Sequence, residues 1–226
     1  MDNFRFERIE KKFRMTEQQY EALLPTLQAH MQPDRHGIST VWNAYCDTED
    51  LSLIRRSVER PLFKEKLRLR CYHVPRENDE VFVELKRKLN GIGYKRRMTV
   101  TYAQAKRLLA GEAVNSEDRQ VEREVLEFVR RYYPRPRVYI LYRRYAMFSK
   151  DDPQLRITVD RELSFCTEEN GHFKPIAGEE NTVLLEIKTL NGVPPWLWKE
   201  LSRLQIYQAP FSKVGTCFLR HLAQTL

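Results

Sequence analysis

Segments that alternate charged and apolar residues recur along the whole chain, and they constrain the fold more than any other feature. Side chains two positions apart lie on the same face of a β-strand. In residues 64–72 four basic side chains share one face, while Leu67, Leu69 and Cys71 share the other. The same alternation predicts further strands near residues 5–14, 39–47, 81–89, 93–101, 137–148, 154–165 and 182–190.

Helix signals fall between these strands. Thr16 and Gln19 form a capping box, which predicts a helix near residues 17–30. Gly111 ends a helix expected near residues 102–110, and Ser116 opens a longer one that reaches about Tyr132. Two more helices are expected near residues 194–205 and 215–224.

Most of the predicted strands follow one another through short connections. Parallel neighbours need a dozen or more connecting residues, so the sheet should be antiparallel. Eight strands are enough to close a small barrel. We therefore expect an α+β fold, a closed antiparallel eight-stranded β-barrel with flanking helices, as a single domain over residues 1–226.

The composition excludes several classes of protein. The 226 residues include 39 Lys and Arg against 31 Asp and Glu, a formal net charge of +8. This surplus favours nucleic acid, a phosphorylated molecule or an acidic surface as partner, or else serves solubility alone. We find no apolar stretch long enough to span a membrane, no apolar signal region at the N-terminus, and no G-x-x-x-x-G-K-S/T phosphate-binding loop.

Cysteine and histidine spacing argues against a zinc site. The four cysteines include no C-x-x-C pair, and the five histidines are scattered, with no second histidine three or four residues from any of them. We therefore expect four reduced thiols, packed in the interior.

The charged strand faces have two interpretations. Like charges aligned on one face are destabilising unless something compensates them. On any one strand, Lys and Arg are most simply a solvated face that discourages edge pairing. Repeated on five or six strands of a closed barrel, they would converge on a lumen that binds polyphosphate, with the interspersed carboxylates holding a divalent cation.

The ordered set of motifs resembles the VTC domain of polyphosphate polymerases. The N-terminal Arg8-x-Glu10-x-Lys12 is similar to the E-x-E-x-K signature of the triphosphate tunnel metalloenzymes, with Arg in place of the first Glu. The other matching stretches are Tyr45-Cys46-Asp47-Thr48, Lys66-Leu67-Arg68-Leu69-Arg70, Val83-Glu84-Leu85-Lys86, Tyr142-Arg143-Arg144, Leu155-Arg156-Ile157-Thr158-Val159-Asp160, Leu185-Glu186-Ile187-Lys188 and Phe211-Ser212-Lys213.

The resemblance implies roles for individual residues. The side chains that would contact the reacting phosphates are Lys12, Arg68, Arg70, Lys86, Arg144 and Arg156. Those that would bind the nucleotide or the product chain are Arg8, Lys66, Lys88, Lys95, Tyr142, Lys188 and Lys213. Glu186 resembles the family's ligand for Mn²⁺ or Mg²⁺, and Glu10 and Glu84 are secondary candidates.

The activity implied by the resemblance is ATP-dependent polyphosphate synthesis. The expected partners are ATP and inorganic polyphosphate, with no stable nucleic-acid complex, and a membrane protein supplied in trans would fit a cytoplasmic enzyme at the inner face of a membrane. Because an anionic phosphate oxygen needs no strong base, Arg8 in the signature favours a polymerase over a triphosphatase. Hydrolysis of a triphosphate, and binding of polyphosphate or RNA without catalysis, stay open as alternatives.

Overall fold

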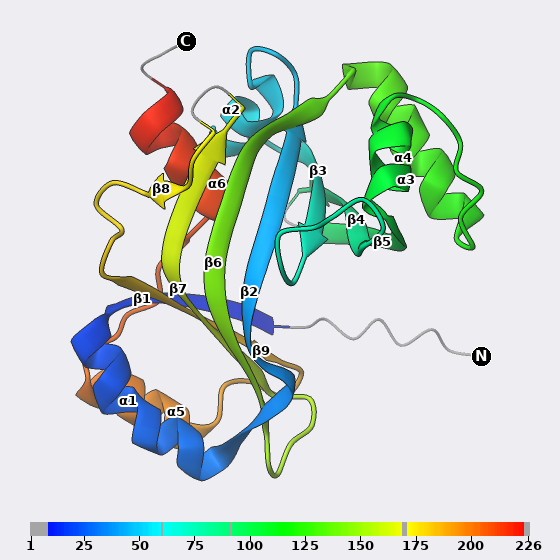
Figure 1. Ribbon diagram of the computed structural model, residues 1–226. Coiled ribbons are helices and arrows are strands. Elements are labelled where there is room, and N and C mark those ends of the chain that lie inside the picture. The colour runs from blue at the N-terminus through cyan, green and yellow to red at the C-terminus, as the bar shows by residue number, and fades with distance from the viewer. Residues whose placement is uncertain (1–8, 60, 91, 169–170, 224–226) are drawn as a thin grey trace. The chain divides into compact units, whose positions relative to one another are not determined.

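The structure is a computed structural model that describes residues 9–59, 61–90, 92–168 and 171–223 (Figure 1). Its strands are β1 (Ile9–Thr16), β2 (Met31–Asp47), β3 (Phe63–Cys71), β4 (Glu80–Leu89), β5 (Ile92–Thr101), β6 (Arg135–Ser149), β7 (Arg156–Thr167), β8 (Lys174–Pro175) and β9 (Thr182–Thr189). Its helices are α1 (Glu17–His30), α2 (Ser52–Val58), α3 (Tyr102–Leu109), α4 (Arg119–Tyr132), α5 (Pro195–Arg203) and α6 (Lys213–Cys217), with a π-helical turn over Phe218–Leu222. The predicted strands and long helices are confirmed, whereas α2 and β8 were not predicted.

The strands form an open sheet. They pair in the order β1-β9-β7-β6-β2-β3-β4-β5, and β8 pairs with β7. β1 and β5 are the two ends of this order, and no pairing among the described residues joins them. The expected closed eight-stranded barrel is therefore wrong, and the fold is a mixed α+β fold with an open nine-stranded antiparallel sheet. Alternation defines the faces of each strand, but closure depends on the tilt and stagger of all strands together, which no local pattern contains.

The chain divides into two compact units. Unit 1 comprises Met1–Thr40, Tyr142–Leu163 and Gly178–Phe211, and unit 2 comprises Val41–Leu141, Ser164–Ala177 and Ser212–Leu226. The long strands β2, β6 and β7 contribute residues to both units. The expectation of a single domain stays a prediction.

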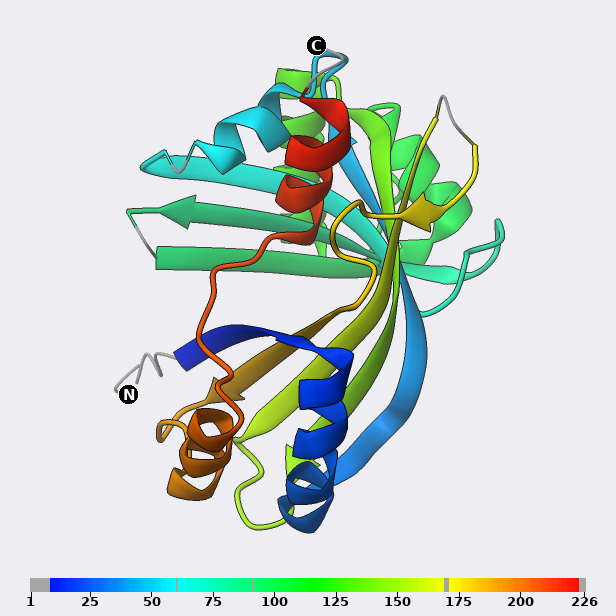
Figure 2. The ribbon, with the colours of Figure 1, turned by 90° about the vertical axis from the view of Figure 1, so that its left-hand side faces the viewer.

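The core of unit 1 lies between one face of its strands and two helices. Phe13 of β1 is the register partner of Leu185 of β9, which in turn is the partner of Val159 of β7. α1 and α5 lie side by side (Figure 2), and their Leu27 and Leu201 pack fully buried in the same cluster. Burying one such side chain stabilises the fold by about 1.5–3 kcal/mol.

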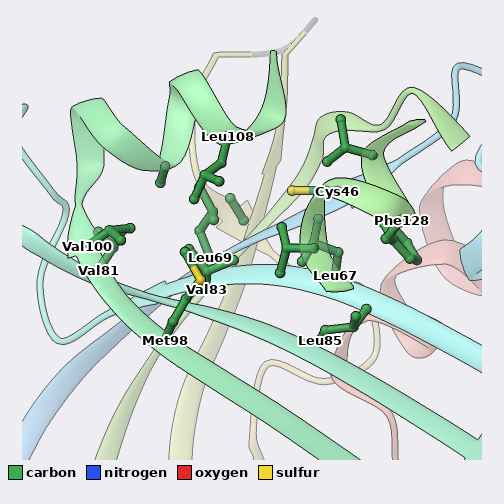
Figure 3. Close-up of a cluster of buried hydrophobic side chains, with 14 of the residues drawn as sticks. Cys46, Leu67, Leu69, Val81, Val83, Leu85, Met98, Val100, Leu108 and Phe128 are labelled. Atoms are coloured by element: carbon green, nitrogen blue, oxygen red, sulfur yellow. The ribbon is translucent and has the colours of Figure 1, made fainter. Parts of the chain in front are cut away.

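The core of unit 2 lies between one face of β3, β4 and β5 and the helices α3 and α4. Figure 3 shows Leu67, Val83 and Met98 on the strands near Leu108 of α3 and Phe128 of α4, and all five are buried. Because successive side chains of a strand alternate between faces, the residues between these positions lie on the opposite face of the strands. In both units the apolar strand face is covered by helices, as the alternation indicates.

Side-chain caps begin α1, α3, α4 and α6. The predicted capping box of α1 is present, with Thr16 accepting from the Gln19 N–H and the Gln19 side chain accepting from the Thr16 N–H. For α4 the cap is Asp118 and not Ser116, because the Asp118 carboxylate accepts from the Val121 N–H at 3.1 Å. The unpredicted α2 begins under the buried Asp47 carboxylate, which accepts from two N–H groups of its first turn at 2.9 and 2.8 Å.

Two predictions from composition can be compared with the structure. All four cysteines are free and buried, as predicted. Burial raises the pKa of the Cys217 thiol to about 12. Among the described residues, no helix combines the length and the apolar character needed to cross a membrane.

Candidate functional site

Three lysines stand side by side on the exposed strand face of unit 2. The strand register aligns Lys66 of β3 with Lys86 of β4, and Lys86 with Lys95 of β5. We call these three residues the lysine row. Burial first, and then the charges of Lys64, Lys86 and Arg68, lower the pKa of Lys66 to about 8. Lysines that face one another across strands are destabilising in the free protein, so this arrangement favours an anionic ligand.

The next row along the same strands centres on one buried carboxylate, Glu84, whose side chain is 1% exposed. Arg68 donates its Nε–H to Oε2 of Glu84 at 2.6 Å, and Arg70 Nε lies 3.9 Å from the same oxygen. Arg97 donates through Nε and Nη2 to Oε1 at 2.9 and 2.6 Å, and the Lys95 ammonium also contacts Oε1. We call these five residues the Glu84 cluster. Burial raises the pKa of the Glu84 carboxyl, but its cationic neighbours outweigh burial and the net pKa is lowered.

Two residues of β2 orient the arginines of this cluster. Arg68 donates through Nη1 to the Tyr45 hydroxyl at 3.3 Å, and Arg70 donates its Nε–H to the Asn43 side-chain oxygen at 2.9 Å. Burial raises the pKa of Tyr45, but Arg68, Lys66 and Arg70 outweigh it, so the net pKa is lowered. The unit 2 face therefore presents guanidinium groups held in defined orientations next to the lysine row.

The exposed strand face of unit 1 mixes carboxylates with lysines. In register, Glu186 of β9 lies between Lys12 of β1 and Thr158 of β7. The Lys12 ammonium lies 3.0 Å from Glu10 and 3.9 Å from Glu186, and the Lys188 ammonium contacts Glu186 at 2.5 Å. Two carboxylates thus share one lysine, so both lie near the same point of this face.

In unit 1 an arginine of β6, Arg144, is largely buried and pairs with Asp160 of β7. Arg144 donates through Nε and Nη2 to the two oxygens of Asp160 at 2.7 and 2.8 Å, and its guanidinium lies 5.4 Å from the centre of the Tyr142 ring. The side chains of Arg144 and Asp160 are only 14% and 2% exposed. Arg156, by contrast, is exposed, and it is the register partner of Lys188. The bidentate pair fixes the orientation of the Arg144 guanidinium.

The unit 1 face offers the donor types that a divalent cation prefers. Glu10 and Glu186 supply carboxylate oxygens, and Thr158 supplies a buried hydroxyl oxygen that has no hydrogen-bond partner among the described residues. Mg²⁺ is commonly bound by one or two carboxylates together with substrate phosphates. The described residues include no group of three or more His, Cys, Asp and Glu suited to a metal. The residues therefore fit a cation whose other ligands come from phosphate.

The structure brings most of the predicted site residues together, in one group per unit. On the strand face of unit 2 lie Lys66, Arg68, Arg70, Glu84, Lys86, Lys88 and Lys95. On the strands of unit 1 lie Glu10, Lys12, Tyr142, Arg144, Arg156, Glu186 and Lys188. Lys213 is the first residue of α6, away from these strands in sequence, and Arg8 lies outside the described residues. The roles of all these residues stay predictions.

Five residues of these faces were not among the predicted site residues. Arg97 belongs to the Glu84 cluster, and Tyr45 and Asn43 accept from its arginines. Asp160 and Thr158 belong to the unit 1 face. Alternation would have found Arg97, because it lies two positions beyond Lys95 in a predicted strand. The pairing of Arg144 with Asp160 has no local signal, since it joins two different strands.

Comparisons with known proteins identify the family of this chain. The model of the VTC domain family matches residues 7–220, and the chain belongs to that family. We found no curated protein sequence that matches it.

Solved structures are similar to this chain at low sequence identity. HpAC1 from Hippeastrum, a candidate adenylyl cyclase described as having a dominant triphosphatase activity, is 16% identical with a TM-score of 0.53, over 93% of this chain and 95% of that chain. The PH1819 protein from Pyrococcus horikoshii OT3 is 14% identical with a TM-score of 0.48, over 97% of this chain and 100% of that chain. At such identity the likeness to HpAC1 extends to the fold alone.

Proposed function

We propose that this protein is a polyphosphate polymerase that transfers the γ-phosphoryl group of ATP to the end of an inorganic polyphosphate chain, assisted by Mn²⁺ or Mg²⁺. The observation that carries the proposal is the lysine row beside the Glu84 cluster, in a member of the VTC domain family. A polyphosphate carries charge at every phosphate, and the basic residues on neighbouring strands of this face match that repeated charge. Arg grips phosphate oxygens in pairs, and Lys adds point charges.

The chemistry asks for alignment and charge neutralisation more than for a base. An anionic terminal oxygen of the polyphosphate chain forms a bond to the γ-phosphorus of ATP. The bond from that phosphorus to the bridging oxygen breaks, and its electron pair leaves on ADP. Arg68, Arg70 and Lys86 would stabilise the charge on the transferring group, and Lys66 and Lys88 would hold the chain.

The residues of unit 1 would contribute the second part of the proposed chemistry. Glu10, Glu186 and Thr158 would hold the divalent cation, with Glu186 as the principal ligand. When bound, such a cation stabilises negative charge on phosphoryl oxygens. Arg144, fixed by Asp160, and Lys12 would bind phosphate oxygens directly.

Hydrolysis of a triphosphate is the second candidate function. It is favoured by the fold that this chain shares with HpAC1, which is described as having a dominant triphosphatase activity. A hydrolase must orient and activate a water molecule, usually with several carboxylates and often with a second metal ion. On the unit 2 face four basic side chains surround the one carboxylate of Glu84, which argues for the polymerase.

The test is a product assay on matched variants. The full chain is incubated with ATP and Mn²⁺, and the phosphate polymer formed is sized on a gel. We expect Arg68→Ala and Glu186→Ala to lower synthesis at least about a hundredfold, as losses of transition-state donors do. Arg96→Ala and Glu77→Ala remove exposed charges from the same protein outside the two faces and should leave synthesis unchanged. Full activity in either of the first two variants would remove that residue from the proposal.

A further inference from the structure

Arg97 combines the features of a phosphate-binding residue, although the motifs of the sequence did not point to it. Its register partner is Glu84, and its guanidinium lies 4.4 Å from the centre of the Phe82 ring, which supports one of its planar faces. The side chain is 38% exposed, so a ligand can reach it. A guanidinium that is held by a carboxylate and an aromatic ring is pre-oriented for binding oxygen anions.

The Glu84 cluster carries one negative charge against four positive charges. Both carboxylate oxygens of Glu84 are engaged, Oε2 by Arg68 and Oε1 by Arg97 and Lys95. A divalent cation at Glu84 would have to displace these groups and would meet four like charges at short range. The donor set therefore fits an anion that binds to the cations, and it does not favour a metal at Glu84.

We infer that Glu84 is a positioning residue that orients Arg68, Lys95 and Arg97 toward a phosphate group, and that Arg97 is itself a phosphate-binding residue. The inference rests on the proposed function and concerns only unit 2. Glu84 touches no reacting atom in this account. It gathers cations that would otherwise repel one another and fixes their donor geometry before the ligand arrives.

Neutralising Glu84 separates positioning from simple charge. Glu84→Gln makes the face more positive by one unit, so an electrostatic account without positioning expects tighter binding of an anion. The glutamine amide offers one acceptor oxygen, and its NH₂ group faces the donors of Arg97, Arg68 or Lys95. The inferred role therefore predicts weaker binding, in spite of the added positive charge.

The experiment is calorimetric binding of inorganic tripolyphosphate to the full chain, measured in EDTA and again with Mn²⁺. We expect Glu84→Gln and Arg97→Gln each to weaken binding in EDTA by about tenfold or more. Because Glu84 acts partly through Arg97, the fold-loss of affinity in the double variant should be smaller than the product of the fold-losses in the two single variants. Melting curves and circular dichroism establish that each variant is folded.

Two control variants match these changes on the opposite face of the same strands. Glu65→Gln neutralises a buried carboxylate that is 3% exposed and pairs with Arg87 at 3.1 Å. Arg96→Gln removes the charge next to Arg97 in sequence. The Arg96 side chain is 53% exposed, and its Nε lies 3.5 Å from Glu124. Both should leave tripolyphosphate affinity within about threefold of the wild type.

Each other outcome overturns the inference. Tighter or unchanged binding of tripolyphosphate by Glu84→Gln would show that Glu84 acts only through its charge and does not orient its neighbours. A loss of affinity seen only with Mn²⁺ would make Glu84 a metal ligand. Unchanged binding in Arg97→Gln would remove Arg97 from the site, even if Glu84→Gln fails to fold. If wild-type protein binds no tripolyphosphate in either condition, the proposed function itself fails, and that result is distinct from unchanged variants.

Discussion

Replacing Lys66 by methionine should make the folded protein more stable at neutral pH while weakening its grip on phosphate. Burial first, and then the charges of Lys64, Lys86 and Arg68, lower the pKa of Lys66 from 10.5 to about 8, although Tyr45 acts in the opposite direction. Holding that lysine charged in the folded state at pH 7 therefore costs about 3 kcal/mol relative to the unfolded chain. Methionine keeps the aliphatic length and removes the charge.

The sign of the pH dependence follows from the lowered pKa. Between about pH 8 and 10.5 the unfolded chain binds the proton that the folded protein has released, so the stability of the wild type rises with pH. The gain from Lys66→Met should fall from about 3 kcal/mol at pH 7 to about 1 kcal/mol at pH 10. Urea unfolding followed by tryptophan fluorescence at both pH values measures the free energy of unfolding.

Lys88 of β4 provides the matched control, because it lies on the same face of the sheet as Lys66 and is exposed. Lys88→Met should change the free energy of unfolding by less than about 0.5 kcal/mol at either pH. A Lys66→Met protein that is no more stable than the wild type at pH 7 would refute the reasoning. So would a gain that is equally large at pH 10.

Three further predictions concern stability and reactivity. Asp160→Asn should lower the free energy of unfolding by about 3 kcal/mol or more in urea titrations, because it leaves the buried Arg144 without its counter-charge; a loss below 1 kcal/mol would contradict a tight pair. Thr16→Ala removes the capping box of α1 and should cost about 1 kcal/mol in the same assay, with no loss expected only if the cap is unimportant. The four buried thiols should react with a thiol reagent at pH 8 only after denaturation, and a fast-reacting thiol in the native protein would contradict their burial.

The strands, their faces and the long helices could be predicted because their signals are local. Two-residue alternation places Lys66 and Arg68 on one face and Leu67 and Leu69 on the other, and the helix capped by Thr16 begins where its side-chain signature lies. α2 has no such signature in its own residues, since its cap is the Asp47 carboxylate at the end of a preceding strand.

Sheet closure and the ion pairs could not be predicted from the sequence. Whether β1 pairs with β5 depends on the twist and stagger summed over all strands. The residue pattern of a single strand does not contain that information. The contacts of Glu84 with Arg68 and Arg97 join three strands, so they depend on the register between strands. The motif around Glu84 indicates a metal ligand, but it contains no information on the arginines and the lysine that surround this carboxylate in the folded protein.

The central claim is that this protein joins phosphoryl groups into a chain and does not release them to water. The most direct measurement is incubation of the wild-type protein with γ-labelled ATP and Mn²⁺, followed by separation of labelled polymer from labelled orthophosphate. The account predicts label in phosphate chains longer than the triphosphate of ATP, formed together with ADP. Label found wholly in orthophosphate would identify a triphosphatase and contradict the account.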